Sequence, residues 1–311
     1  MRIALACAFV LPFLLVDVVR AEPYTKVFIN GRATPVYFND GDSFRPMAGP
    51  YKGSQCRLAG FNTLESFGPA HSWGTWTEKE MWVLSKVATH HARHGVWHCE
   101  TDGKKDGYGR LLMMCKDLAL SHIEHGFAQV MTVDEHPGDP DLVAAQRRAI
   151  QIRAGMWAHG VPAYVLSSLH SKAEGGGKDG KTYNRLVSTW DGHSEKWIHE
   201  DDYAECQKVC NKTRAINDES KQKTLAALKA DGGGKTAGDL DDATLARCVL
   251  DYATVGSCAA VPAARRAAID KALAQLVSSG VLVLGAEGPD SCQVYVDFKR
   301  RYGGDRAVCL R

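Results

Sequence analysis

The sequence predicts an α+β protein: a five-stranded β-barrel with three packed helices, followed by a mainly helical, disulfide-containing C-terminal region. Short apolar runs separated by turn residues fill positions 24–62, a pattern typical of strands joined by tight turns. Segments with apolar residues at helical spacing follow within the first 160 positions. Six of the ten cysteines lie beyond residue 200, where the sequence is rich in alanine.

The predicted strands occur in pairs. Asn30-Gly31 separates KVFI from ATPVYF, and Asn-Gly between apolar runs is a strong hairpin signal. The run QCRLAGF follows, and the runs VWHCE and RLLMMC flank a second hairpin loop, TDGKKDGYG. Because the strands come in hairpins and do not alternate with helices, a small barrel is favoured over a doubly wound sheet.

Three helices are expected beside these strands. The first spans residues 69–94, with Gly95 where a helix would stop, and the second spans residues 116–130. The third spans residues 139–154, where Asp139 caps the helix and Pro140 occupies its first turn.

The composition changes after residue 160. Residues 173–181 are polar and glycine-rich, which indicates a loop or linker, and Asp191-Gly192 predicts one more hairpin. From residue 201 onward the pattern is helical. We therefore divide the chain into a barrel domain (22–160), a linker with a β-hairpin (161–200) and a helical C-terminal region of unknown function (201–311).

Residues 1–21 have the pattern of a secretory signal peptide: an early arginine, an apolar run and small residues at the expected cleavage site. The alternative is an uncleaved membrane anchor, but the run is short against the ~20 residues that span a bilayer. A secreted or periplasmic protein follows, with no stable membrane association after cleavage. No protein partner can be inferred.

The cysteines favour disulfides over a metal site, because exported proteins form disulfides and no Cys-x-x-Cys pair is present. Cys99 and Cys115 flank one hairpin, which suggests a cross-strand bond. In that case Cys56 is the unpaired thiol, although Cys56 pairing with either of them stays open. Further on, Cys206 and Cys210 are expected on one helix face, each bonded to a distant partner; the remaining candidates are Cys292, Cys309 and the pair Cys248–Cys258.

The stretch Asp40-Gly41-Asp42 interrupts two predicted strands and has two interpretations. It is either an ordinary turn or a pair of hard oxygen ligands for a cation. The net charge is only +2, so any polyanion site must be a local cluster. Such a cluster is available: Arg57, Asn62, Thr63, Glu65 and Arg110 all fall near strand ends. Phosphodiester hydrolysis needs this set, because a cation, guanidinium groups and a carboxylate together stabilise charge and activate water.

These motifs resemble the staphylococcal-nuclease-like (thermonuclease) family, which has an OB-type barrel. The matching segments are Asp40-Gly41-Asp42, then Arg57-Leu58 through Thr63 and Glu65, and then Asp106-Gly107-Tyr108-Gly109-Arg110. The resemblance covers residues 25–158 and leaves the C-terminal half without a counterpart.

The resemblance implies a Ca²⁺-dependent endonuclease acting on DNA or RNA. It implies Ca²⁺ ligands from Asp42, the Asn62 side chain and the Thr63 carbonyl, with Asp40 assisting. Glu65 is the implied general base, Arg57 and Arg110 the phosphate clamp, and Tyr108 a substrate contact. Lys104 and Lys105 lie beside that clamp and are expected to steer the nucleic-acid backbone, unless they are ordinary loop lysines.

Two departures from the family weaken the expectation. Asn62 stands where the family has aspartate, which removes one negative charge from the metal site. The segment Met131-Thr-Val-Asp134 stands where tyrosines usually contact the nucleotide. An inactive nucleic-acid-binding module on the same barrel is therefore the alternative function. His90, His91 and His94 allow a transition-metal site or simply an exposed helix face.

Overall fold

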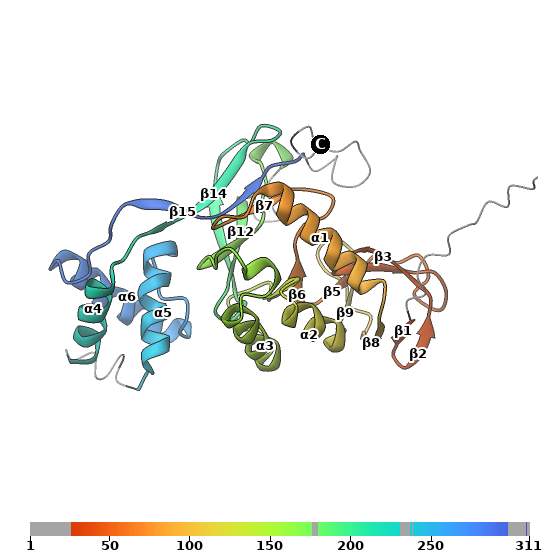
Figure 1. Cartoon of the computed structure of the whole chain (residues 1–311), viewed down its shortest axis with the longest axis horizontal. Helices are drawn as coiled ribbons and strands as arrows, with labels where there is room; N and C mark the ends of the chain where they lie inside the picture. Colours follow the sequence, from red (N-terminus) through yellow and green to blue (C-terminus); the bar gives the residue numbers. More distant parts are fainter. Residues whose placement is uncertain (1–25, 176–179, 231–236, 238, 298–308, 310–311) are drawn as a thin grey trace, which may run out of the picture.

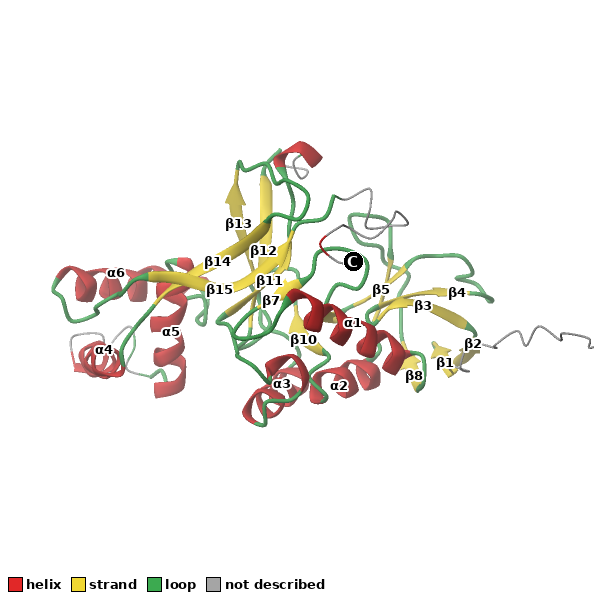
Figure 2. Ribbon diagram, turned by 45° about the horizontal axis from the view of Figure 1, so that its top comes forward, coloured by secondary structure: helices red, strands yellow, loops and turns green. Residues whose placement is uncertain are grey.

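The computed structural model describes residues 26–175, 180–230, 237, 239–297 and 309. It is a mixed α+β structure with six α-helices and several small sheets in this part of the chain (Figures 1 and 2). The predicted signal peptide, residues 1–21, lies outside the described residues. Within them, no helix combines the length and apolar character needed to cross a membrane.

The first strands form hairpins where turn residues predicted them. Strand β1 (Lys26–Ile29) pairs with β2 (Arg32–Thr34) through a turn in which Asn30 and Gly31 both have positive φ angles. Only glycine, and to a lesser degree asparagine, adopts this conformation without strain. Strand β8 (Val96–Cys99) lies parallel to β1 on its other side.

A second sheet has the order β3-β4-β5-β9, with β3 (Val36–Asp40), β4 (Ser43–Pro46), β5 (Cys56–Leu58) and β9 (Leu111–Met113). Strand β6 (Gly60–Thr63) follows β5 directly and pairs with β10 (Ala128–Met131). The described sheets are not closed into a barrel by their hydrogen bonds. Barrel closure therefore stays a prediction.

Three helices accompany these sheets, as expected, but with different bounds. Helix α1 (Glu78–Ala92) begins at a capping box of Thr77 and Glu80, nine residues later than predicted. Helix α2 (Lys116–Glu124) ends just before Gly126, whose φ of 65° stops the helix, so β10 forms where its end was predicted. Helix α3 (Pro140–Gln151) has the expected Asp139 cap.

Large apolar side chains from both sheets meet in one core. Phe38, Phe44, Leu58, Phe61 and Met113 are almost completely buried there, together with side chains of α2 and α3. Each such side chain contributes about 1.5–3 kcal/mol by burial. The strand ends that carry the predicted site residues are thus held by a packed core.

The region 161–200 is more ordered than a linker with a hairpin. The predicted hairpin is present as β12 (Thr182–Ser188) and β13 (Ser194–His199), but β11 (Tyr164–Ser168) adds a buried third strand. Two short 3₁₀ helices, Gly155–Trp157 and Lys172–Glu174, flank β11.

The C-terminal region contains helices α4 (Asp218–Ala230), α5 (Asp242–Val255) and α6 (Ala263–Ser278), as predicted. It also contains two strands that were predicted as helix or left unassigned, β14 (Lys208–Arg214) and β15 (Glu287–Val294). Strand β15 pairs with β14 and with the short strand β7 (His71–Ser72). The two halves of the chain therefore share a sheet, visible above α1 in Figure 1.

Four disulfides are present, and they resolve the alternatives left open by the spacing. Their pairs are Cys99–Cys115, Cys206–Cys309, Cys210–Cys292 and Cys248–Cys258, and Cys56 is a buried free thiol. The expectation that Cys206 and Cys210 share a helix face is wrong. Cys210 lies within β14, and Cys206 precedes that strand in a turn with a φ of 67°.

Candidate functional site

One cavity of about 340 Å³ brings together the predicted catalytic residues. Its lining includes both aspartates of the Asp-Gly-Asp turn and the three predicted catalytic side chains, namely Asp40, Asp42, Arg57, Glu65 and Arg110. They come from the β3–β4 turn, from β5, from the segment after β6 and from the residue before β9. Residues up to 70 positions apart in the sequence thus face the same space.

The Asp-Gly-Asp turn is held in place by its own hydrogen bonds and by β6. Asp40 Oδ1 accepts hydrogen bonds from the Asp42 backbone at 3.2 Å and from the Ser43 hydroxyl at 2.6 Å. A Cβ atom on Gly41 would lie 2.6 Å from the Thr63 methyl group, so this position requires glycine. The buried His122 donates from Nε2 to the Gly41 carbonyl at 3.1 Å, which fixes the turn from below.

Arg57 lies at the centre of the cluster. Its guanidinium forms an ion pair with Asp42 and donates to Asn62 Oδ1 at 2.6 Å, and only 14% of its side chain is exposed. The other oxygen of Asp42 accepts from the Thr63 backbone at 2.8 Å. Charge-assisted bonds of this kind give Arg57 one fixed orientation beside the cavity.

Arg110 is positioned by Asp106 in the loop before β9. Asp106 Oδ2 accepts from Arg110 Nε at 2.7 Å, and Oδ1 accepts from the backbone nitrogens of Tyr108 and Arg110 at 2.9 Å. The Arg110 side chain is 31% exposed, more than that of Arg57, so it can reach a bound anion. Tyr108 is 71% exposed and stacks 5.5 Å from this guanidinium, but it does not line the cavity.

The cavity gathers three carboxylates close to its arginines. Burial, the neighbouring Asp42 carboxylate and Glu65 together raise the pKa of Asp40 to about 8, while Ser43 and Arg57 oppose that rise. Carboxylates gathered in a desolvated space favour either a proton or a cation. The chemistry of this donor set therefore suits a hard divalent cation.

The four predicted metal ligands are only partly gathered. Asp40 and Asp42 line the cavity, whereas Asn62 and Thr63 lie behind it. Asn62 Oδ1 accepts from Arg57, and its amide donates to the Thr63 carbonyl at 2.9 Å. Among the described residues, which include His90, His91 and His94, no group of three or more His, Cys, Asp or Glu side chains is arranged to hold a metal.

The two predicted steering lysines do not join the cluster. Lys104 is 78% exposed and pairs with Asp102 at 2.6 Å, and Lys105 is exposed with its backbone bridged to Leu111. Neither lines the cavity. Their geometry is that of ordinary loop lysines near the Tyr108 turn.

Several lining residues were not predicted from the sequence. Phe67 lies on the rim with 53% of its surface exposed, and Arg45 and Gln55 are also exposed there. Three further unpredicted lining residues come from the C-terminal half: Ser167, Ser168 and Gln293. Neutral polar residues in strands carry no local signal for a site, so only the three-dimensional structure reveals them.

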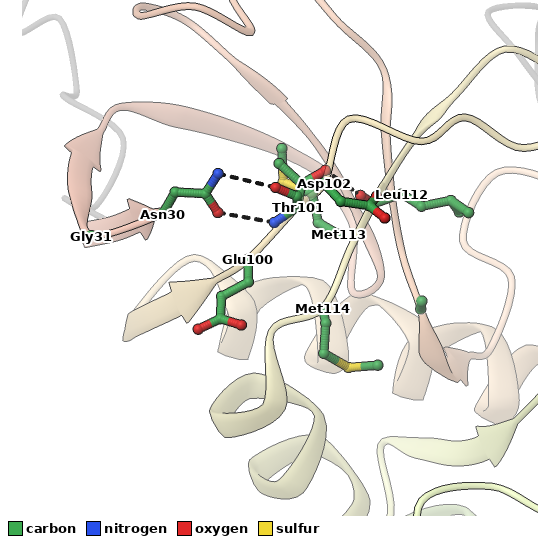
Figure 3. Close-up of a pocket in the computed structure, with 9 residues that line it drawn as sticks. Asn30, Gly31, Glu100, Thr101, Asp102, Leu112, Met113 and Met114 are labelled. Atoms are coloured by element: carbon green, nitrogen blue, oxygen red, sulfur yellow. Dashed lines mark hydrogen bonds between the residues drawn. The ribbon is translucent and has the colours of Figure 1, made fainter.

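A larger hollow, of about 640 Å³, lies elsewhere, between the β1–β2 turn, the segment after β8, and β9 (Figure 3). Its wall includes Asn30, which exchanges two hydrogen bonds with the Thr101 backbone, and the acidic side chains of Glu100 and Asp102. It contains none of the predicted catalytic or metal-binding residues and no arginine or lysine. Phosphate binding is therefore expected at the smaller cavity.

Neither the protein-family models nor the curated proteins contain a match to this chain. We therefore infer the function from the geometry of the cavity and from the motifs that line it.

Proposed function

We propose that the protein is a Ca²⁺-dependent nuclease that hydrolyses phosphodiester bonds of DNA or RNA. The observation that carries this proposal is the cavity that gathers the guanidinium groups of Arg57 and Arg110, with that of Arg45 at the exposed rim, and three carboxylates. Guanidinium groups bind phosphate through paired hydrogen bonds, and a carboxylate can activate a water molecule. In this proposal the Asp-Gly-Asp turn supplies oxygen ligands to the metal ion. The closed barrel implied by the family resemblance is part of the same proposal.

In this mechanism Arg57 and Arg110 bind the non-bridging oxygens of the scissile phosphate and stabilise the charge that develops during attack. Glu65 accepts the proton of the attacking water. Asp106 and Asp42 keep the two guanidinium groups oriented. Ca²⁺ held by Asp40 and Asp42 would supply positive charge at the phosphate. The oxygens of Asn62 and Thr63 would join as ligands only after releasing the hydrogen bonds that they accept from Arg57 and from the Asn62 amide.

The cellular location is proposed on the same basis. Four disulfides among the described residues fit an oxidising compartment, so we propose that the protein is secreted or periplasmic.

The test is hydrolysis of a labelled single-stranded oligonucleotide by the purified protein, with Ca²⁺ or with a chelator. Cleavage should require Ca²⁺, and Glu65→Gln should lower kcat by about 10²–10⁴-fold, because the general base is lost. Glu100→Gln is the matched control, since Glu100 is exposed in the other hollow. Wild-type rates in Glu65→Gln, or cleavage that persists in the chelator, would contradict the proposal.

A catalytically inactive binding module is the second candidate, and Asn62 is the observation that favours it. The neutral amide removes one charge from the proposed metal site, and its oxygen already accepts from Arg57. Oligonucleotide binding with Ca²⁺ but without cleavage would support this function.

Asn62→Asp is expected to increase the affinity of the proposed site for Ca²⁺. A carboxylate at this position adds a charged oxygen to the site, and ligand charge tunes Ca²⁺ affinity. We expect the Ca²⁺ concentration for half-maximal activity to fall about tenfold, a value that corresponds to ~1.4 kcal/mol. Calcium titration of both proteins measures it; an unchanged or higher midpoint would exclude Asn62 from the metal site.

A further inference from the structure

The C-terminal half contributes one wall of the candidate active site. Ser167 and Ser168 in β11 and Gln293 in β15 line the same cavity as Arg57 and Arg110. Strand β15 reaches this position because it pairs with β7, with Gln293 opposite His71. Every other lining residue belongs to the first 110 positions, so the wall is the contribution of the C-terminal half to the site.

Gln293 has an unusual environment. Its side chain is fully buried, and its Nε2 donates to His71 Nε2 at 3.0 Å. Burial lowers the pKa of His71 to about 3, so the ring is neutral and accepts this bond. Gln293 Oε1 has no hydrogen-bond partner among the described residues.

A buried amide oxygen without a donor is costly, and native structures rarely retain one without a purpose. His71 accepts from the amide nitrogen, which leaves the buried oxygen of this cavity-lining residue as an acceptor. A phosphate offers only acceptors at neutral pH, so it does not satisfy the amide. The missing partner is therefore a hydroxyl or N–H group of the nucleoside that carries the phosphate.

The size of the cavity restricts the choice of substrate. At about 340 Å³ it is near the lower limit of small-molecule sites and admits one nucleotide of a single strand, not a duplex. Within a polymer, the DNA sugar has no free hydroxyl group. The RNA sugar offers its 2′-hydroxyl next to the scissile phosphate.

We propose that the wall formed by Gln293 and Ser168 binds the ribose of single-stranded RNA, with Gln293 Oε1 accepting a hydrogen bond from the 2′-hydroxyl. This assignment rests on the proposed nuclease function. The phosphate then lies at Arg57 and Arg110, and the sugar faces the opposite wall. The C-terminal half thereby selects the sugar, while the N-terminal half performs the hydrolysis.

The test uses the full wild-type protein and three DNA oligonucleotides that differ at one sugar, which carries 2′-hydroxyl, 2′-fluoro or 2′-hydrogen. Cleavage at that sugar should be at least about tenfold faster with the hydroxyl than with either analogue, because only the hydroxyl donates. Gln293→Met should reduce this ratio to near one, and Ser168→Ala, at a half-buried position, should reduce it in part. Because the substrate series uses the wild-type protein, the test holds even if Gln293→Met does not fold.

Equal cleavage of all three sugars in a Ca²⁺-dependent reaction would overturn the ribose assignment and leave the nuclease proposal intact. A cleavage preference that depends on the base, and not on the 2′ substituent of the sugar, would also overturn the ribose assignment. So would a 2′,3′-cyclic phosphate product, since the hydroxyl would then act as the nucleophile. Absence of cleavage for every oligonucleotide would contradict the nuclease function itself.

Discussion

Arg57→Ala is expected to abolish hydrolysis and to lower the free energy of unfolding by about 3–5 kcal/mol. The substitution leaves Asp42, whose side chain is 6% exposed, without its ion-pair partner, and it also removes the donor to Asn62. Breaking a buried pair by removing one partner costs this much because the remaining charge stays desolvated. Urea denaturation followed by circular dichroism measures the change.

Arg110→Ala is the matched control for that experiment. Its guanidinium is 31% exposed and its ion pair with Asp106 lies near the surface, so stability should change by less than about 1 kcal/mol. Hydrolysis should nevertheless fall about 10²–10³-fold, as expected for a donor to the transition state. If both variants lose stability equally, Arg57 does not have the structural role assigned to it.

Removing the Cys210–Cys292 disulfide is the second change with a large expected effect. The two cysteines are 82 residues apart, but the Cys206–Cys309 bond encloses them, so their bond closes an additional loop of about 21 residues and is expected to stabilise the folded state by about 3.3 kcal/mol. This is a large fraction of a typical stability of about 5–15 kcal/mol. The double variant with Cys210→Ser and Cys292→Ser should therefore unfold at a lower urea concentration than the wild-type protein.

The Cys248–Cys258 bond provides the comparison, because its separation is 10 residues and the same relation gives about 2.7 kcal/mol. Its removal should also leave hydrolysis unchanged, since the pair lies in the helical C-terminal cluster and not beside the cavity. Loss of Cys210–Cys292 disturbs the residue preceding Gln293 and should lower activity as well. The opposite order of stabilities would contradict the loop-length argument.

Local sequence patterns predicted much of the secondary structure in the first half of the chain. Asn30-Gly31 predicted a hairpin, and Asp139 with Pro140 predicted the start of α3, because turn and cap chemistry is local. The candidate catalytic residues were predicted from ordered motifs, and the cavity gathers Arg57, Glu65 and Arg110.

The C-terminal strands were not predicted, for a physical reason. The two-residue strand β7 exists only because β15 pairs with it, and nothing in His71–Ser72 itself indicates that partner. Strand β14 shows its strand period in burial and not in its sequence, because the buried Asn211 is polar. Its first residues alternate between exposed and buried side chains, the two-residue period of a strand.

The predicted metal ligands show a second limit of prediction from sequence. Spacing predicted that Asn62 and Thr63 belong near the aspartates, and both contact the same network. Which oxygen faces the cavity depends on side-chain hydrogen bonds, since Arg57 engages the Asn62 amide. A motif defines neighbours but not the direction in which each atom points.

The pairing of β7 with β15 also sets when the protein can become functional. His71 and Gln293 are 222 positions apart, so the ribosome needs about 10–45 s to add the second after the first at typical elongation rates. During that interval the cavity lacks the part of its lining that Gln293 supplies. A nascent chain thus completes this cavity only after Gln293 has been synthesised.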